Sequence, residues 1–297
     1  MKIETERLII TKFTMDMAQA VQENSLDEDN RRFVPDEVFE TLEEAKDTVG
    51  FLMGVYENGD GPLVYPILLK DNTYIGYVQA VPFEENKWEI GYHIGEAFTK
   101  QGYATEAVKA FLPVIMERLG ITKMFGVCLS ENKGSVRVME KSGFVKLYEG
   151  LGSYQSEECE ICKFVYYMPP KDLVVKFFEN GYTNRNYDFV MECVAEDYAD
   201  HSPASAKSNA DTVGVLKIVA GQFTDFKATV VDVFSENNMV AARVLFEGVH
   251  TGECMGIPAT GKVIRFEALE NFRVEKGEIK ESWGYWPDKE IESKLRD

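Results

Sequence analysis

The sequence contains little positive charge relative to its negative charge. Among its 297 residues, 32 lysines and arginines stand against 50 aspartates and glutamates, so the formal net charge is −18. A surface this acidic repels phosphate backbones and anionic lipids, and we therefore expect no nucleic-acid partner and no membrane partner. The same charge favours a cationic ligand, such as an amine.

The sequence also has few cysteines, and the five are too scattered for a disulfide framework. Cys159 and Cys162 lie close together in the stretch CEIC, and the residues KFVYYM that follow predict a strand. Residues three apart on a strand point to opposite faces, and two thiols are half of the ligands that a structural zinc requires. We therefore expect free thiols and no metal site.

Long apolar runs are absent as well. No apolar stretch reaches the length of about 18 residues that suggests a transmembrane helix. The N-terminus, MKIETERLIITKF, is charged from its second residue and lacks the apolar core of a signal peptide. These absences predict a cytoplasmic protein.

The length of the chain predicts two domains, because 297 residues with 45% hydrophobic content exceed one typical core. Residues 1–168 alternate strand and helix patterns, which is typical of a mixed α/β domain. Pro169 and Pro170 then interrupt the chain, because consecutive prolines continue neither a helix nor a strand ladder. Residues 171–297 place helical patterns before a run of long strand patterns, which predicts an α+β domain.

Local signals position several elements of the first domain. Thr41 and Glu44 form a capping box at the start of a predicted helix. Asp71 and Asn72 predict a hairpin turn between two strands. Pro113 lies inside another predicted helix, where its ring removes a backbone hydrogen bond and predicts a kink.

The strand pattern WEIGYHI has one unusual face. With a period of two, apolar side chains alternate with Glu89, Gly91 and His93, which share the other face. Gly91 would let a backbone or a ligand approach closely. Glu89 is our leading candidate for a general base, with His93 as an alternative base or as a structural histidine.

The helix that follows begins in the stretch KQGYAT. A helix start carries unpaired N–H groups and a partial positive charge, so it can hold a phosphate. Gly102 and Ala104 have side chains too small to shield those amides. A plain loop-to-helix turn is the alternative interpretation.

Four separated blocks, TERL, WEIGYHI, QGYATEA and ENKGSVRVMEKSGF, occur in the order and spacing of the GNAT acetyltransferases. Residues 1–168 most resemble the RimJ/RimL branch of that family. The resemblance implies a GNAT fold, with a mixed central sheet flanked by helices, and acetyl-CoA as the co-substrate. The diphosphate of the coenzyme would lie on the amides of Gln101, Gly102, Tyr103, Ala104 and Thr105.

The same resemblance implies further roles. Asn132 and Ser135 match positions that meet the pantetheine arm of the coenzyme. Tyr148 is one candidate for the acid that protonates the leaving thiolate. Thr99 departs from the pattern, because many relatives carry glutamine or arginine there. The acceptor would be a peptide N-terminus or a small-molecule amine, with aminoglycosides and polyamines among the open choices.

In the second domain, the stretch KVIRFEALENFRV carries Glu270 as the only charge on its apolar face. A carboxylate buried without a partner takes up a proton instead. His250 lies on the apolar face of the preceding strand, so we expect both groups to point into one apolar cavity. A twist or bulge that leaves Glu270 in water is the alternative.

The stretches DYADHSP and HTGECMGIPATGK resemble the SnoaL-like polyketide cyclases, which have the cone fold of the nuclear-transport-factor-like proteins. The resemblance covers residues 171 to about 290 and implies a curved sheet wrapped by helices, without a cofactor. It implies Glu270 as the acid/base, His201 and His250 as polar positions, and Trp283 as a lining residue of the same cavity. It also implies a homodimer formed through the sheets.

The leading hypothesis is an N-acetyltransferase that uses acetyl-CoA, followed by a cone-shaped domain that binds a small molecule. One alternative is a sensor that binds coenzyme A and a metabolite without turnover. Another is a protein whose cone domain is an isomerase or a cyclase.

Overall fold

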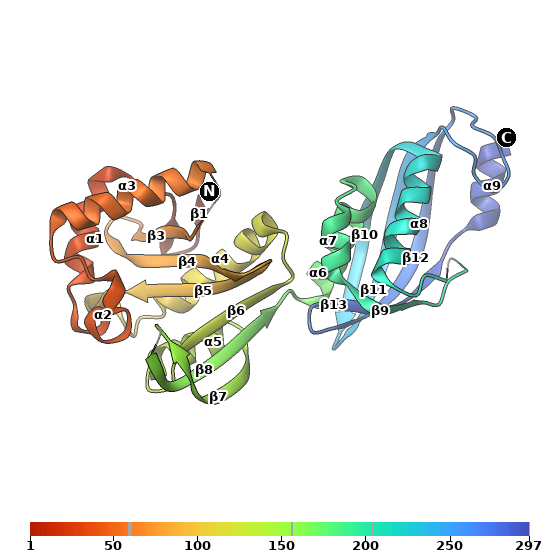
Figure 1. The fold of residues 1–297 in the computed structure, drawn as a ribbon. Coiled ribbons are helices and arrows are strands. Elements are labelled where there is room, and N and C mark those ends of the chain that lie inside the picture. Colours follow the sequence, from red (N-terminus) through yellow and green to blue (C-terminus); the bar gives the residue numbers. More distant parts are fainter. Residues whose placement is uncertain (59–60, 156, 204, 297) are drawn as a thin grey trace. The chain divides into compact units, whose positions relative to one another are not determined.

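The computed structural model describes residues 1–58, 61–155, 157–203 and 205–296. The chain divides into two compact units (Figure 1). The first comprises Met1–Leu119 and Lys123–Tyr166, and the second comprises Gly120–Thr122 and Tyr167–Asp297.

The first unit is built on an eight-stranded sheet in the order β1-β2-β3-β4-β5-β6-β8-β7. The strands are β1 (Ile3–Glu4), β2 (Leu8–Ile10), β3 (Leu63–Leu69), β4 (Tyr74–Glu84), β5 (Lys87–Ile94), β6 (Lys123–Leu129), β7 (Val145–Tyr154) and β8 (Glu157–Tyr167). Neighbours from β1 to β5 pair antiparallel, whereas β5 and β6 pair parallel, so the predicted mixed sheet is confirmed.

Helices cover both faces of this sheet. They are α1 (Ala18–Ser25), α2 (Glu28–Phe33), α3 (Leu42–Asn58), α4 (Tyr103–Leu119) and α5 (Lys133–Lys141), with short 3₁₀ turns η1 (Met15–Met17), η2 (Pro35–Glu37) and η3 (Glu96–Phe98). The turn η2 reaches the face that carries Tyr77 of β4, and α5 reaches the opposite face at Tyr92 of β5.

Most local signals in this unit are confirmed. Thr41 Oγ1 accepts a hydrogen bond from Glu44 N at 3.3 Å, and Thr41 N donates to Glu44 Oε2 at 3.0 Å, which completes the capping box. Asn72 has a φ of 69° in the hairpin turn between β3 and β4. The helix α4 continues through Pro113. The sequence patterns gave no sign of α1, α2, η2 or β7.

The second unit has a five-stranded sheet in the order β10-β11-β12-β13-β9. Its strands are β9 (Val194–Asp200), β10 (Phe223–Glu236), β11 (Met239–His250), β12 (Val263–Glu275) and β13 (Glu278–Tyr285), and its helices are α6 (Pro170–Phe178), the π-helical turn η4 (Glu179–Thr183), α7 (Tyr187–Cys193), α8 (Asn209–Gln222) and α9 (Asp288–Arg296). The predicted α+β domain is confirmed.

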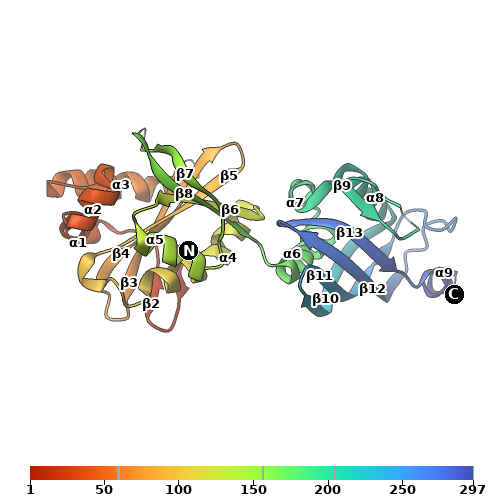
Figure 2. The same ribbon diagram turned by 90° about the horizontal axis from the view of Figure 1, so that it is seen from below.

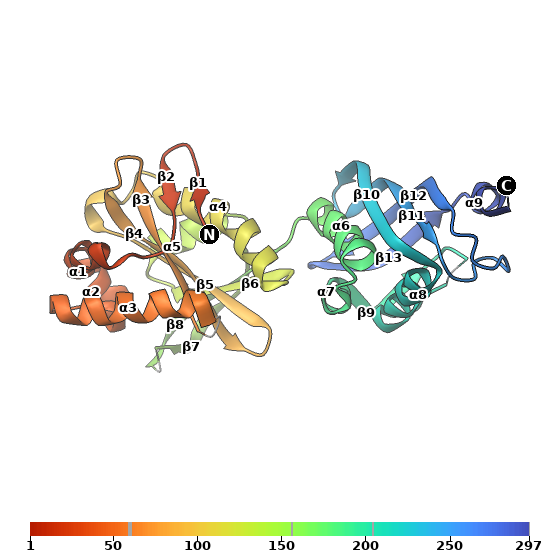
Figure 3. The same ribbon diagram turned by 90° about the horizontal axis from the view of Figure 1, so that it is seen from above.

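Helices α6, α7 and α8 lie over one face of this sheet (Figure 3), and the view from the other side shows its strands in front (Figure 2). Register irregularities between Thr224 and Lys227 and between Val230 and Asp232 bend β10, which gives the sheet its curvature. Phe246 and Phe272 lie fully buried on the helix-covered face, where Phe178 of α6 contacts both.

One element of this unit differs from the prediction. The helical pattern over residues 186–198 predicts one helix, but α7 ends at Cys193 and the next residues form β9. The strand β9 pairs parallel with β13, for example at Ala199 opposite Glu281. This tertiary pairing overrides the weak helical preference of the segment.

The five cysteines are free thiols, as predicted. Cys162 is buried whereas Cys159 is partly exposed, in keeping with their places on opposite faces of β8. Over the described ranges, no helix is both long and apolar enough to cross a membrane.

Candidate functional site

The first candidate site lies where strands β5 and β6 separate. Strand β5 pairs with β4 along its whole length, but among the described residues it pairs with β6 only at Glu89, opposite Phe125. Beyond Glu89 the edge of β5 that faces β6 therefore lacks a strand partner. Unpaired backbone groups at such an opening are available to a ligand.

The chain leaves β5 through η3 and enters α4 at Gly102. A residue with a side chain would be strained in the backbone conformation found there. Gly102 has a φ of 84°, in the left-handed region. Within the described part of the chain, none of the backbone amides of residues 101–105 has an acceptor, and Glu106 N is the first to bond, at 3.0 Å to Gly102 O. These amides form the set of donors that an anion at a helix start requires.

Arg7 of the TERL stretch fixes this helix start. Its Nη1 donates to Gln101 O at 3.0 Å, its Nε donates to Glu106 Oε2 at 2.6 Å, and its guanidinium lies 4.5 Å from the centre of the Tyr103 ring. Burial alone would raise the pKa of Glu106, but hydrogen bonds from Thr5 and Arg7 hold it below its ordinary value. The sequence patterns did not identify Arg7 or Glu106 individually.

Asn132 and Ser135 lie at the start of α5. Asn132 Oδ1 accepts a hydrogen bond from Ser135 N at 2.9 Å and so caps the helix. Ser135 O in turn accepts from the Tyr92 hydroxyl at 3.0 Å, which joins α5 to β5. Their contacts hold α5 against the separating strands, and their role toward the coenzyme stays a prediction.

Glu89 is half-buried at the last paired position of β5 and β6. Burial raises the pKa of its carboxyl to about 7, while a backbone hydrogen bond from Val127 and the charge of Lys163 partly oppose that shift. A carboxyl with a pKa near neutrality suits a general base. Its position beside the opening supports the role predicted for it.

His93 lies on the same face as Glu89 but in different surroundings. Its Nε2 lies 3.5 Å from Asp27 Oδ2, its ring stacks on Tyr77, and its side chain is 10% exposed. Burial lowers the pKa of His93, and the nearby charge of Asp27 opposes the shift. These contacts favour a structural histidine over a second base.

Glu37 of η2 is a site residue that the sequence did not reveal. Its carboxylate accepts hydrogen bonds from the hydroxyl of Tyr77 and, at 3.3 Å, from Nε2 of Gln79. Burial raises the pKa of Glu37 to about 7, and the charge of Asp36 adds to that shift. Glu37 lies in a short turn without helical or strand periodicity, so no pattern signals it.

Tyr154, at the end of β7, links the two carboxyl groups electrostatically. Its hydroxyl lies 3.4 Å from Phe33 O, to which it donates a hydrogen bond. Burial raises the pKa of Tyr154 to about 12, and the charges of Glu89 and Glu37 both add to that shift.

Tyr148, the candidate for the acid that protonates the thiolate, is instead 44% exposed. Its hydroxyl donates a hydrogen bond to Leu151 O at 2.8 Å.

The second candidate site surrounds Glu270 inside the second unit. Glu270 lies opposite Ala242 of β11 and Gly284 of β13. Burial raises its pKa to about 8, a hydrogen bond from Ser282 opposes the shift, and the charge of Asp200 adds to it. Glu270 is half-buried, and the groups that act on it are polar rather than apolar.

Ser282 connects three polar groups around Glu270. Its Oγ lies 2.5 Å from the hydroxyl of Tyr198 and 3.5 Å from Asp200 Oδ1, and the residue is fully buried. Asp200 also accepts hydrogen bonds from Ser202 N and Ser202 Oγ, each at 2.7 Å. Neither Ser282 nor Asp200 was singled out from the sequence.

His250 is not beside Glu270, contrary to the sequence-based expectation. Ala242 is the β11 residue opposite Glu270, and His250 follows eight residues later, which is about 26 Å along an extended strand. His250 is fully buried, and its Nδ1 accepts a hydrogen bond from Thr260 N at 3.3 Å. The shared face was predicted correctly, but the length of the strand separates the two groups.

His201 and Trp283 lie on the outer face of the sheet, which also differs from the expectation. Their rings stack 4.8 Å apart, and His201 Nε2 lies 3.5 Å from Glu281 Oε2. Glu281 and Trp283 flank the buried Ser282 on β13, so they point away from Glu270. It is Trp286 that contacts the interior, with its ring 4.9 Å from that of Phe246.

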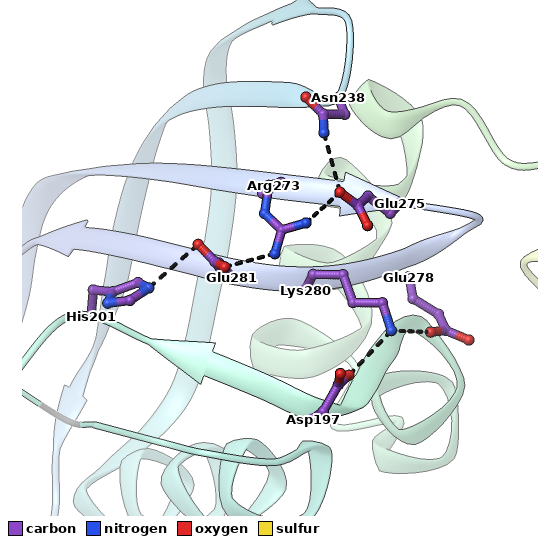
Figure 4. A network of polar contacts seen from close by, with 8 residues as sticks. All are labelled: Asp197, His201, Asn238, Arg273, Glu275, Glu278, Lys280 and Glu281. Atoms are coloured by element: carbon purple, nitrogen blue, oxygen red, sulfur yellow. Dashed lines mark hydrogen bonds and ion pairs between the residues drawn. The ribbon is translucent and has the colours of Figure 1, made fainter.

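Figure 4 shows the polar network to which His201 belongs. Arg273 bonds to Glu281 at 2.6 Å and pairs with Glu275. Lys280 lies 3.2 Å from Asp197 and 2.9 Å from Glu278 on the same face. Because this network is exposed, each pair contributes little to stability.

Comparisons with known proteins match each unit to a family. Residues 7–145 match the family model described as an acetyltransferase (GNAT) domain. Residues 172–293 match the model described as a SnoaL-like polyketide cyclase. The two matches correspond to the two resemblances found in the sequence, and acetyl-CoA is the co-substrate of the first family.

Individual relatives cover one unit each. The uncharacterized N-acetyltransferase YnaD of Bacillus subtilis (strain 168) is 33% identical over 145 residues, which are 48% of this chain and 82% of that protein. The structure of RimL, a ribosomal L7/L12 α-N-protein acetyltransferase in complex with coenzyme A, is 18% identical with a TM-score of 0.50, covering 57% of this chain and 98% of that one. Wild-type IdmH from Streptomyces antibioticus is 25% identical with a TM-score of 0.39, covering 43% of this chain and 99% of that one.

Proposed function

We propose that this chain, which belongs to the GNAT family of acetyltransferases and carries a SnoaL-like unit after its GNAT unit, acetylates an amine that binds beside Glu89. The observation that carries the proposal is the position of Glu89. It is the last residue of β5 paired with β6, and its pKa of about 7 leaves a large share of the carboxyl deprotonated at neutral pH.

Acetyl-CoA supplies an acyl group that is already activated as a thioester. The protein must therefore align an amine and remove its proton. Glu89 accepts that proton directly or through a water molecule. The amides of residues 101–105 hold the diphosphate of the coenzyme, and Arg7 fixes the backbone that carries them.

The identity of the amine is tested by measuring thiol release from acetyl-CoA with the full chain and a panel of amines. The panel includes a peptide N-terminus, because the RimL relative is an acetyltransferase of a ribosomal protein, together with aminoglycosides and polyamines. Acetylation of one class supports the proposal. Tight binding of coenzyme A without turnover of any amine supports a sensor instead.

Replacing Gly102 with alanine is expected to raise the Kd of acetyl-CoA about tenfold. A side chain at a φ of 84° costs about 1–2 kcal/mol, and relief of that strain moves the amides that would hold the diphosphate. Isothermal titration calorimetry of the full chain measures the change.

Gly120 provides the matched control for that experiment. It has a φ of 66° just after the opposite end of α4, and a β-carbon added there would meet no other atom within 4 Å. Gly120→Ala therefore introduces similar strain far from the helix start and is expected to leave the Kd unchanged. Equal Kd values for Gly102→Ala and the unmodified chain would argue against the diphosphate site.

For the second unit, we propose a site that exchanges a proton with a small molecule through Glu270. The supporting observation is a half-buried carboxyl with a pKa of about 8, bonded to Ser282 and close enough to Tyr182 for its charge to raise the pKa of that hydroxyl. In the deprotonated form, Glu270 takes a proton from a carbon next to a carbonyl group, and the resulting enolate takes a proton back from the acid.

This activity predicts that the chain accelerates exchange of the α protons of α-tetralone in heavy water. The exchange, followed by NMR, is expected to fall to the uncatalysed rate in Glu270→Gln. Glu267→Gln is the control, because Glu267 lies on the same strand but is exposed and pairs with Arg243 at 2.9 Å. Equal exchange in the two variants would contradict the proposed role of Glu270.

A further inference from the structure

We infer that Glu37 is a specificity-determining residue of the acetyl transfer, and that the acceptor is an amine that carries a second cationic group. The inference rests on the proposed function, because it assigns the chemistry of the molecule that binds beside Glu89. It is carried by the placement of Glu37 on the sheet and by the neutral groups that hold it.

The strand register places Glu37 close to Glu89. On the face that carries Glu89, Tyr77 lies opposite His93, and Gln79 lies opposite Gly91, which is two residues after Glu89 on β5. Because Glu37 bonds to both Tyr77 and Gln79, its carboxylate lies about 7 Å or somewhat more from the position of Glu89. Tyr154, whose pKa responds to both charges, lies within electrostatic range of each.

Gly91 makes this placement of Glu37 feasible. A β-carbon at Gly91 would lie 2.6 Å from Gln79 Nε2, so any larger residue would displace the Gln79 amide. With glycine there, the amide lies across β5 and donates to Glu37 Oε1. The sequence pattern suggested that the bare backbone at Gly91 admits a ligand. In the structure, the space at Gly91 is instead filled by the Gln79 amide, which orients the Glu37 carboxylate.

Glu37 is held by neutral donors only. Among the residues that the structure describes, no lysine, arginine or histidine lies within ion-pair distance of it, and the groups that act on its charge are Asp36 and Gln79. A half-buried carboxylate without a counter-ion is stabilised when a ligand supplies one. A cationic group of the acceptor meets that requirement and leaves the reacting amine near Glu89.

The experiment compares two amines of equal size with the full chain. Putrescine carries a second ammonium group, and n-pentylamine carries a methyl group in its place. We expect kcat/KM to be higher for putrescine, and Glu37→Gln to raise the KM for putrescine about tenfold or more with kcat within about twofold. The same variant is expected to leave both constants for n-pentylamine unchanged.

Two further measurements separate recognition from structural damage. Glu40→Gln removes the charge of a nearby exposed residue, which pairs with Arg31 at 2.6 Å and does not act on Glu37, and is expected to leave the putrescine KM unchanged. Calorimetry of acetyl-CoA binding to Glu37→Gln is expected to give the same Kd as the unmodified chain.

An equal rise in KM for both amines in Glu37→Gln, or no rise for putrescine, would overturn the inference but not the acetyl transfer. Absence of turnover with every amine would instead overturn the proposed function and the inference with it.

Discussion

Replacing Glu89 with glutamine is expected to lower kcat for acetyl transfer by about 100- to 1000-fold. Glutamine has nearly the size and shape of glutamate, so the pairing of β5 with β6 at Phe125 is retained. The amide cannot accept the proton of the attacking amine, and only solvent remains as the base. Steady-state thiol release with saturating acetyl-CoA measures the loss, and the Kd of acetyl-CoA is expected to stay the same.

The pH dependence provides an independent test of the same residue. Because burial raises the pKa of Glu89 to about 7, the active, deprotonated form is lost as the pH falls through that value. The logarithm of kcat is therefore expected to rise with pH up to about 7 and then to level off, whereas the profile of Glu89→Gln lacks this rise. Glu85→Gln, a change at an exposed turn residue, serves as the control. An unchanged profile in Glu89→Gln would assign the base elsewhere.

The period of the strand pattern was enough to predict the Glu89 face. Glu89, Gly91 and His93 share one face as predicted, because β5 has no bulge in that stretch and its pairing with β4 is continuous there. The helix start after it could also be predicted, because the conformation of Gly102 is encoded locally. Sequence patterns of this kind report on neighbours along the chain.

Glu37 shows why the rest of this site could not be predicted. Its partners Tyr77 and Gln79 are 40 and 42 residues away in the sequence. The turn that carries it has no periodicity, and its position depends on how α1, α2 and η2 pack on the sheet. That packing is a tertiary property, so the residue becomes visible only in the folded structure.

A bulge explains why Trp283 does not line the cavity, as the resemblance implied it would. Ile279 of β13 is buried, and a strict alternation from it would place Glu281 and Trp283 on the inner face as well. A register irregularity between Ile279 and Glu281 reverses the alternation, so Ser282 is buried and Trp283 faces outward. The sequence of β13 gives no sign of this irregularity, because its residues suit either face.

Glu270→Gln is expected to stabilise the second unit at neutral and alkaline pH. Burial raises the folded-state pKa of Glu270 to about 8 from an ordinary value of 4.5, so the folded chain binds this proton more tightly than the unfolded chain. The stability that protonated Glu270 provides is complete below pH 4.5 and declines as the pH rises to about 8. Glutamine does not ionise and escapes that decline, so the free energy of unfolding of the variant exceeds that of the unmodified chain by an amount that grows with pH.

The expected difference is large because the pKa shift is large. It grows by about 1.4 kcal/mol per pH unit within this window and reaches on the order of 5 kcal/mol. For a unit of this size, that corresponds to a rise in Tm of about 15–20 °C at pH 9, with nearly equal Tm values at pH 4.5. Scanning calorimetry of the full chain at both pH values measures the effect, with Glu267→Gln, on the outer face of the same strand, as the control. Parallel pH dependence in Glu270→Gln and the unmodified chain would mean that Glu270 remains in contact with water in the folded state, and the proton exchange proposed for it would then lose its physical basis.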